Sequence, residues 1–124
     1  MSALNLDTES AHIAERLRNS KTLLVACLCA EWCSTCCEYK STFWNLANLH
    51  PEICFVWIDI ETHADWLDEI VIENFPTILI EDKNISHFFG TVIPNITIIE
   101  RMLVNLTVLP NLQHAPKLRN LLSI

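Results

Sequence analysis

Two short, almost continuously apolar segments constrain the fold of this chain more than any other feature. Residues 22–30 and residues 53–60 are each of strand length, and both are typical of strands that are buried on two faces. The segment between them ends at Pro51, which cannot continue a helix. We therefore predict a strand, a helix over residues 33–49 and a second strand. The apolar positions at helical spacing in that segment are Tyr39, Phe43, Leu46 and Ala47.

The rest of the chain adds further strands and helices to this core. We predict a short strand at residues 4–6, then a helix capped by Asp7 that turns Ile13 and Leu17 inward. Further expected elements are a helix at 62–70, a hairpin of strands 77–80 and 86–89, a helix at 95–106 and a short helix opening at Pro116. Strands and helices alternate early and a hairpin comes late, so the predicted fold is α/β, a central mixed sheet flanked by helices.

Charge and hydropathy exclude several classes of partner. The formal net charge of −7 and the absence of a Lys/Arg cluster argue against nucleic acid as a partner. The longest uncharged run, at residues 22–30, is too short to span a membrane, and the first ten residues lack the pattern of a signal peptide. Six cysteines in a chain that starts this way favour a soluble, cytoplasmic protein whose thiols stay mostly reduced.

The segment Trp32-Cys33-Ser34-Thr35-Cys36 follows the first predicted strand directly. If a helix starts at Cys33, its sulfur caps free N–H groups of the first turn, where the helix dipole favours a thiolate. Cys36 lies one turn later on the same face, close enough to attack a mixed disulfide at Cys33. The spacing therefore provides a nucleophile and a resolving thiol. A structural zinc site is the alternative, but no second pair of ligands follows at zinc-binding spacing, so we expect no metal.

The sequence resembles the thioredoxin family over roughly residues 4 to 106. The resemblance rests on Ala30-Glu31-Trp32-Cys33-x-x-Cys36 and on the later Phe75-Pro76-Thr77. It implies a thioredoxin fold, with residues 1–106 as a thioredoxin-like domain. Residues 107–124 lie outside the resemblance, and we expect a helical extension there, packed on the domain or next to it.

The resemblance also implies roles for individual residues. Cys33 is the attacking thiol, Cys36 the buried resolving thiol, and Trp32 a flat neighbour that shields the sulfur. Pro76 matches the family's cis-proline, which faces the active-site sulfurs and turns the backbone of Phe75 toward a bound substrate chain. Gly90 falls where the family has a glycine in a loop beside the site, and a turn that needs positive φ explains this glycine equally well.

Several positions depart from the family pattern. Ser34-Thr35 replaces the usual Gly-Pro pair, which leaves the redox potential open. Cys27 stands where thioredoxins have a buried aspartate, and Trp57 replaces the associated lysine, so the usual proton acceptor for the resolving thiol is missing. Cys37 stands where the family often has a basic residue that favours the Cys33 thiolate.

The four extra thiols allow two interpretations. Cys27 and Cys29 alternate on one strand and point to the same face, and Cys54 lies in another buried strand, so packing in the core is the default. The functional interpretation makes Cys27, beneath the site, or Cys37, beside Cys36, an auxiliary thiol that offers an alternative disulfide partner.

We expect a thiol-disulfide oxidoreductase that reduces protein disulfides through a Cys33/Cys36 cycle. No bound cofactor is expected, and since the chain has no glycine-rich dinucleotide loop, electrons must come from a separate reductase. The alternative is a thioredoxin-fold binding or chaperone module with a weak or vestigial redox site, which the missing aspartate, lysine and Gly-Pro pair favour. Metal or cluster handling by the six thiols is a third hypothesis.

Overall fold

The computed structural model describes residues 3–19, 22–30, 33–61, 76–82, 86–91 and 96–104. Five sequence predictions lie outside these residues: the helix at 62–70, the short helix at Pro116, the extension at 107–124, and the placements of Trp32 and Phe75. All six cysteines fall inside them, so the position of every sulfur that could take part in disulfide exchange is described.

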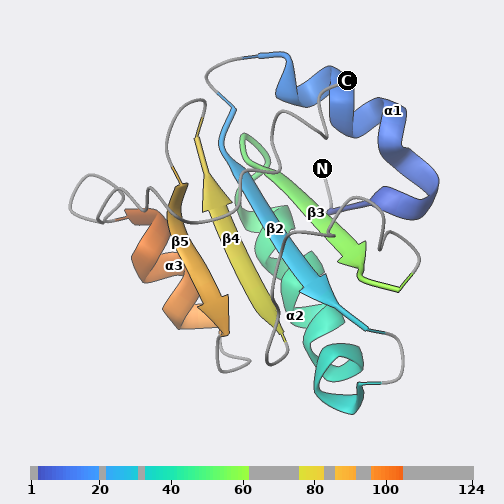
Figure 1. Ribbon diagram of the computed structural model, residues 1–124. Coiled ribbons are helices and arrows are strands. Elements are labelled where there is room, and N and C mark those ends of the chain that lie inside the picture. Colours follow the sequence, from blue (N-terminus) through green and yellow to red (C-terminus); the bar gives the residue numbers. More distant parts are fainter. Residues whose placement is uncertain are drawn as a thin grey trace.

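A mixed five-stranded sheet forms the centre of the fold (Figure 1). Its strands are β1 (Leu4–Asn5), β2 (Leu24–Cys29), β3 (Cys54–Asp59), β4 (Thr77–Glu81) and β5 (Ser86–Thr91), in the order β1-β3-β2-β4-β5. β3 is parallel to both β1 and β2, while β4 is antiparallel to β2 and to β5. β2 and β3 are apolar on both faces because the central strands are covered on both sides.

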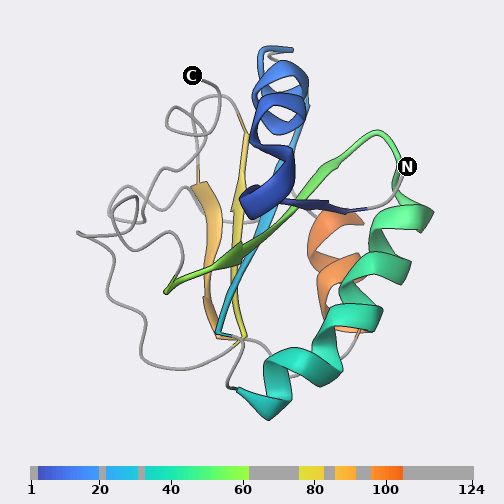
Figure 2. The same cartoon turned by 90° about the vertical axis from the view of Figure 1, so that its right-hand side faces the viewer.

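Helices cover both faces of the sheet. α2 (Ser34–Leu49) and α3 (Ile96–Val104) lie together on one side (Figure 2), where Tyr39, Phe43 and Leu46 of α2 pack on the sheet. α1 (Leu6–Leu17) packs Ile13 and Leu17 on the opposite face. Two apolar clusters result, and each uses alternate residues of the same strands. The predicted α/β fold, a mixed sheet flanked by helices, is therefore confirmed.

Most element predictions in the described residues are confirmed, with shifts of a few residues at the ends. The predicted cap at Asp7 is wrong, because α1 already begins at Leu6. Glu9 has non-helical angles inside this helix (φ −129°, ψ 26°), and its carboxylate accepts a hydrogen bond from the Asn5 N–H at 3.1 Å. No helix in the described part of the chain is long and apolar enough to cross a membrane.

The described residues of the predicted site lie near one end of the sheet, where three strands end and one begins. β2 and β3 terminate at this end and β4 begins there, since Leu28 pairs with Thr77 and Cys29 with Asp59. β5 also ends there, with Thr91 opposite Thr77, and α2 starts just beyond the end of β2 (Figure 1). The first turn of α2 is thus placed beside the ends of four strands.

Candidate active site

Cys33 occupies the position that the sequence predicts, immediately before the first turn of α2. It is the N-cap residue, with φ −85° and ψ 116°, and its carbonyl oxygen accepts a hydrogen bond from the Cys37 N–H at 3.1 Å. Its side chain makes no capping hydrogen bond, so the predicted capping by the sulfur is wrong. The thiol is half-buried and packs against the cluster under α2, which leaves one side open to solvent.

Cys36 is buried one turn further along α2, and its sulfur is bonded to Cys29 rather than to Cys33. Cys29 is the last residue of β2, and the Cα atoms of the two cysteines are 5.7 Å apart. From the sequence we expected Cys29 to be a packing residue, and Cys27 or Cys37 to be the alternative partner. The structure corrects this assignment, because the first turn of α2 lies over the end of β2 and brings Cys36 to Cys29.

Cys27 lies directly beneath this disulfide. Its side chain has no exposed surface, and its Sγ is 3.7 Å from the Sγ of Cys29. Burial raises the pKa of the Cys27 thiol well above its usual value, so the thiol stays protonated at neutral pH. The Cys29 sulfur in a disulfide carries no hydrogen, and therefore Cys27 is the donor in this contact.

Cys27 faces Trp57 across β2 and β3 in register. The family resemblance implies that these residues replace a buried aspartate and its lysine, and here they are neighbours. A cation does reach Trp57 from α2, since the Lys40 Nζ lies 5.8 Å from its ring centroid and 5.5 Å from that of Trp44. The Lys40 side chain is exposed, so its ammonium does not enter the buried position under the disulfide.

Tyr39 is a second buried polar group of this cluster. The side chain has no exposed surface, and its hydroxyl has no hydrogen-bond partner among the described residues. Burial and, as a lesser cause, the nearby Cys27 raise the pKa of the Tyr39 phenol well above its ordinary value. Both groups beneath the site are therefore neutral at physiological pH.

Two further predicted site residues lie at the same end of the sheet. Pro76 is buried and directly precedes Thr77, which pairs with Leu28, so the proline lies level with the end of β2. Gly90 lies inside β5, opposite Ile78, and its φ is not in the left-handed region. The loop and the positive-φ turn proposed for Gly90 are therefore both wrong. A Cβ at this position would make an ordinary contact with Phe88 at 3.5 Å.

Cys37 and Asp59 complete the site. Cys37 is exposed on α2, next to Cys36 in sequence. Asp59, half-buried at the end of β3, is in register with Cys29 and accepts a hydrogen bond from the Glu61 N–H at 2.9 Å. We did not predict this carboxylate from the sequence. Its position at the carboxyl end of a strand parallel to β2 is the signal that points to it.

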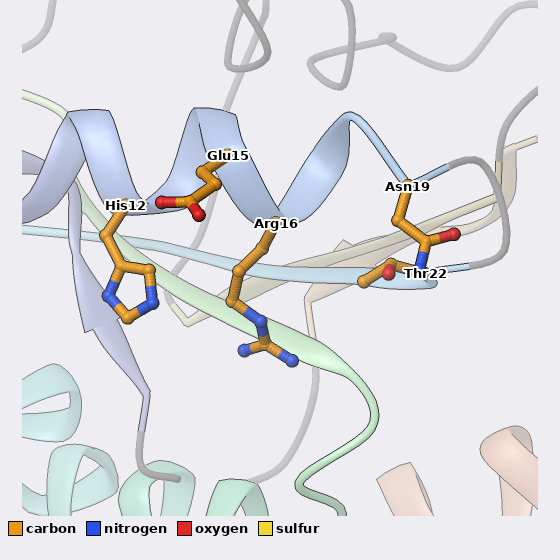
Figure 3. Close-up of a pocket in the computed structure, with 5 residues that line it drawn as sticks. All are labelled: His12, Glu15, Arg16, Asn19 and Thr22. Carbon is orange, nitrogen blue, oxygen red and sulfur yellow. The ribbon is translucent and has the colours of Figure 1, made fainter.

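A separate hollow lies at the opposite end of β2. It is open to solvent, has a volume of about 430 Å³, and is formed by α1 and the turn that follows it (Figure 3). Arg16 in its wall donates to the backbone carbonyl oxygens of Pro51 and Ile53 at 3.0 and 3.3 Å. The lining residues are His12, Glu15, Arg16, Asn19 and Thr22. None of the cysteines contributes to this hollow. Within the described ranges, no three His, Cys, Asp or Glu side chains are grouped in a way that could hold a metal ion.

Comparison with known proteins places this arrangement in a family. The family model described as Thioredoxin matches residues 5–101. An Arabidopsis thaliana protein that carries the name thioredoxin H10 is 33% identical over 61 residues, which are 49% of this chain and 40% of that protein. The thioredoxin-like protein CXXS1 of Oryza sativa subsp. japonica is 33% identical over 63 residues, 50% of this chain and 47% of that protein. The matched stretch thus spans less than half of each relative.

Solved structures show the same fold at low sequence identity. The germline-specific thioredoxin Deadhead of Drosophila melanogaster has a TM-score of 0.67 at 20% identity, covering 86% of this chain and 98% of its own. The thioredoxin of Fasciola hepatica has a TM-score of 0.65 at 19% identity, covering 84% and 97%. The fold, the position of the cysteines at the start of α2 and the family match agree, and the chain belongs to the thioredoxin family.

Proposed function

We propose that this protein is a thiol-disulfide oxidoreductase that reduces disulfide bonds of other proteins through Cys33 and Cys36. One observation carries the proposal. Cys33 is a half-exposed thiol at the N-cap of α2, and Cys36 lies buried one turn later on the same helix. An accessible thiol at a helix N-terminus followed by a protected second thiol is what disulfide exchange requires.

The reaction begins with the protein reduced. The Cys33 thiolate attacks one sulfur of the substrate disulfide, and the other substrate sulfur leaves with the electron pair and takes up a proton. Cys36 then loses its proton and attacks the Cys33 sulfur. The second substrate thiol is released, and a Cys33–Cys36 disulfide remains. Two electrons have passed from the protein to the substrate.

A separate dithiol reductase returns these electrons, and a reducing compartment such as the cytoplasm suits the cycle. The buried Pro76 lies level with the end of β2 and supports the placement of the substrate, because the family resemblance implies that this proline lies beside an extended substrate chain. Asp59 is the carboxylate in register with Cys29 and would take part in proton transfer.

Insulin reduction with dithiothreitol as the electron donor tests this function. Wild-type protein and Cys54→Ala, a change in a buried strand thiol of the other core cluster, are expected to accelerate the reaction alike. Cys33→Ser is expected to abolish the acceleration because the attacking sulfur is gone. Cys36→Ser, reduced and then separated from dithiothreitol before insulin is added, is expected to keep a mixed disulfide with its substrate, since the resolving sulfur is missing.

A binding or chaperone module is the second candidate. The observation that favours it is the bond between Cys36 and Cys29, which leaves Cys33 without its resolving thiol in this oxidised form. If fully reduced wild-type protein gives no acceleration over dithiothreitol alone, and Cys36→Ser captures no substrate through Cys33, the oxidoreductase proposal is wrong and the binding module replaces it.

A further inference from the structure

Cys36 lies between two thiols that come from different elements. Cys33 precedes it by three residues, as the N-cap of α2, and packs against the same apolar cluster. Cys29 meets it from the end of β2, with the Cα atoms 5.7 Å apart, and holds its sulfur in the structure. One resolving thiol therefore has two possible disulfide partners, one half-exposed and one buried.

Resting on the function proposed above, we infer that Cys29 is a second resolving thiol of this protein. It displaces Cys33 from the Cys33–Cys36 disulfide and holds the oxidised state as the buried Cys29–Cys36 disulfide, while Cys33 becomes a thiol again. The oxidised protein then presents the Cys33 thiol at the start of α2, close in sequence to the exposed Cys37. Cys33 can form a mixed disulfide there, but Cys36 is held by Cys29 and cannot release it.

The exchange needs no external oxidant or reductant. Cys29 loses its proton, and its sulfur attacks the Cys36 sulfur of the Cys33–Cys36 disulfide. The Cys29–Cys36 bond forms, the Cys33–Cys36 bond breaks, and the electron pair leaves on Cys33, which takes up a proton. One disulfide and one thiol are present before and after the step. The original disulfide comes from the protein disulfide that the enzyme has reduced.

The surroundings of Cys29 fit this role. In the disulfide form its sulfur accepts a hydrogen bond from the Cys27 S–H at 3.7 Å, and because burial raises the pKa of the Cys27 thiol, this donor keeps its proton. The Cys27 S–H is positioned to donate to a thiolate at Cys29, and a charge without a hydrogen bond would be costly to bury in this apolar cluster. Cys27 is thus a positioning residue for the exchange.

The Cys29–Cys36 disulfide is less accessible to external thiols than a Cys33–Cys36 disulfide. Cys29 and Cys36 are each 1% exposed, whereas Cys33 is half-buried and Cys37 exposed. An external thiol reaches the buried bond poorly, so reduction has to begin with an attack by Cys33 on Cys36. The buried disulfide is therefore expected to be reduced more slowly than a Cys33–Cys36 bond.

Peptide mapping distinguishes the two disulfides because Glu31 lies between the cysteines concerned. Cleavage after glutamate yields residues 16–31, which carry Cys27 and Cys29, and residues 32–38, which carry Cys33, Cys36 and Cys37. A Cys29–Cys36 bond joins the two peptides, whereas a Cys33–Cys36 bond leaves them separate. The reduced full chain is treated with glutathione disulfide, quenched with acid at increasing times, alkylated with N-ethylmaleimide and digested.

We expect the internal disulfide of peptide 32–38 first and the joined peptides later, with the label on Cys27, Cys33 and Cys37. In Cys29→Ala the joined peptides should be absent, and the internal disulfide should persist. In Cys33→Ser the joined peptides should form more slowly than in wild type, by a factor on the order of ten, because the oxidant must reach a buried sulfur directly. If wild type never yields joined peptides, or if Cys33→Ser yields them as fast as wild type, the inference is overturned.

Two controls keep the interpretation unambiguous. Cys54→Ala removes another buried strand thiol and should give the wild-type time course. Cys29→Ser serves as a second variant if Cys29→Ala unfolds. The peptide mapping of the wild-type protein tests the inference without either variant. Insulin reduction without joined peptides would refute the role of Cys29 and leave the proposed function standing. Joined peptides without insulin reduction would refute the proposed function and leave the internal exchange standing.

Discussion

Cys27 and Tyr39 are the residues whose chemistry depends most on burial. Each side chain is fully removed from solvent in the cluster beneath the disulfide. Cys27 donates to a sulfur, whereas the Tyr39 hydroxyl has no partner among the described residues. Burying a hydroxyl without a hydrogen bond costs about 1–3 kcal/mol on the scale of protein mutations. Tyr39 therefore carries a cost that the surrounding contacts offset.

Tyr39→Phe is expected to raise the free energy of unfolding by about 1 kcal/mol, because it removes the unpartnered hydroxyl and keeps the ring that packs against Phe43. Denaturant melts at pH 7 under fixed redox conditions measure the change. Ser41 lies on the same helix and is exposed, so Ser41→Ala serves as a control and should change stability by no more than about 0.5 kcal/mol. A loss of stability in Tyr39→Phe would mean that the hydroxyl has a hydrogen-bond partner outside the described residues.

The same two groups predict destabilisation at alkaline pH. In the unfolded chain, Cys27 and Tyr39 ionise around their ordinary pKa values of 9.0 and 10.0, while in the folded protein both values are raised. The unfolded state then binds fewer protons, so the free energy of unfolding falls as pH rises above about 9, by up to about 1.4 kcal/mol per pH unit and group. Below the unfolded-state pKa values, both groups are protonated in both states, and their stabilising contribution is fully present.

Melts across pH 7 to 11, with the redox state held fixed, separate the two groups. Tyr39→Phe should flatten the fall above pH 10, and Cys27→Ala should flatten the part that begins near pH 9. Equal slopes in wild type and both variants would show that neither group is neutral and buried in solution.

Accessibility of the thiols gives another prediction at this scale. In the oxidised form that the structure shows, Cys33 and Cys37 are reachable by solvent, while Cys27 and Cys54 are buried thiols. Brief treatment with iodoacetamide should therefore add two labels to the native protein and four to the unfolded protein, as read from the intact mass. Labelling of Cys27 or Cys54 in the native protein would contradict their burial.

At the scale of the elements, α2 connects the site to the core. Its first turn carries the cysteines, and its middle carries Phe43, whose ring lies 5.4 Å from that of Phe55 and 5.7 Å from that of Trp57. Aromatic pairs at such distances stabilise a fold beyond the area they bury. The helix therefore holds Cys36 over β2 through contacts made two turns away.

Phe43→Ala is expected to lower the free energy of unfolding by about 3–5 kcal/mol, because it leaves a cavity among these rings. Leu49→Ala is the matched control, since Leu49 lies on the same helix and is 62% exposed. Denaturant melts should show a change within about 0.5 kcal/mol for the control. Comparable losses in both variants would mean that the helix is not oriented as described.

At the scale of the whole molecule, the Cys29–Cys36 bond ties the sheet to the helix layer. It joins residues seven positions apart, across the connection between β2 and α2. Closing a loop of this size removes conformational freedom mainly from the unfolded chain. The stabilisation expected from this effect is about 2 kcal/mol.

The oxidised protein should therefore unfold at a higher denaturant concentration than the reduced protein, with a difference in the free energy of unfolding of about 2 kcal/mol. Paired melts with and without dithiothreitol provide the measurement. In Cys36→Ala neither disulfide of the site can form, and the difference should vanish. A difference that survives in Cys36→Ala would point to a disulfide among the other cysteines.

The sequence by itself determined the strands at residues 22–30 and 53–60, the helix between them and the later hairpin. Each of these features is local, because apolar periodicity and a terminating proline act within a few residues. The sequence also placed Cys33 at the start of α2 and Cys36 one turn later. The prediction of a loop or turn at Gly90 was wrong, because nothing in the neighbouring sequence distinguishes a glycine in a turn from a glycine in an edge strand.

Only the tertiary structure decided which sulfur meets Cys36. The spacing along the chain allows Cys33, Cys37 or a strand cysteine, and the choice depends on how the first turn of α2 packs over the end of β2. The register of β2 with β3, which sets Asp59 beside Cys29 and Cys27 beside Trp57, is likewise a result of pairing distant segments. Such contacts arise when a whole sheet and its helices bury their apolar faces together, and no short stretch of sequence encodes them.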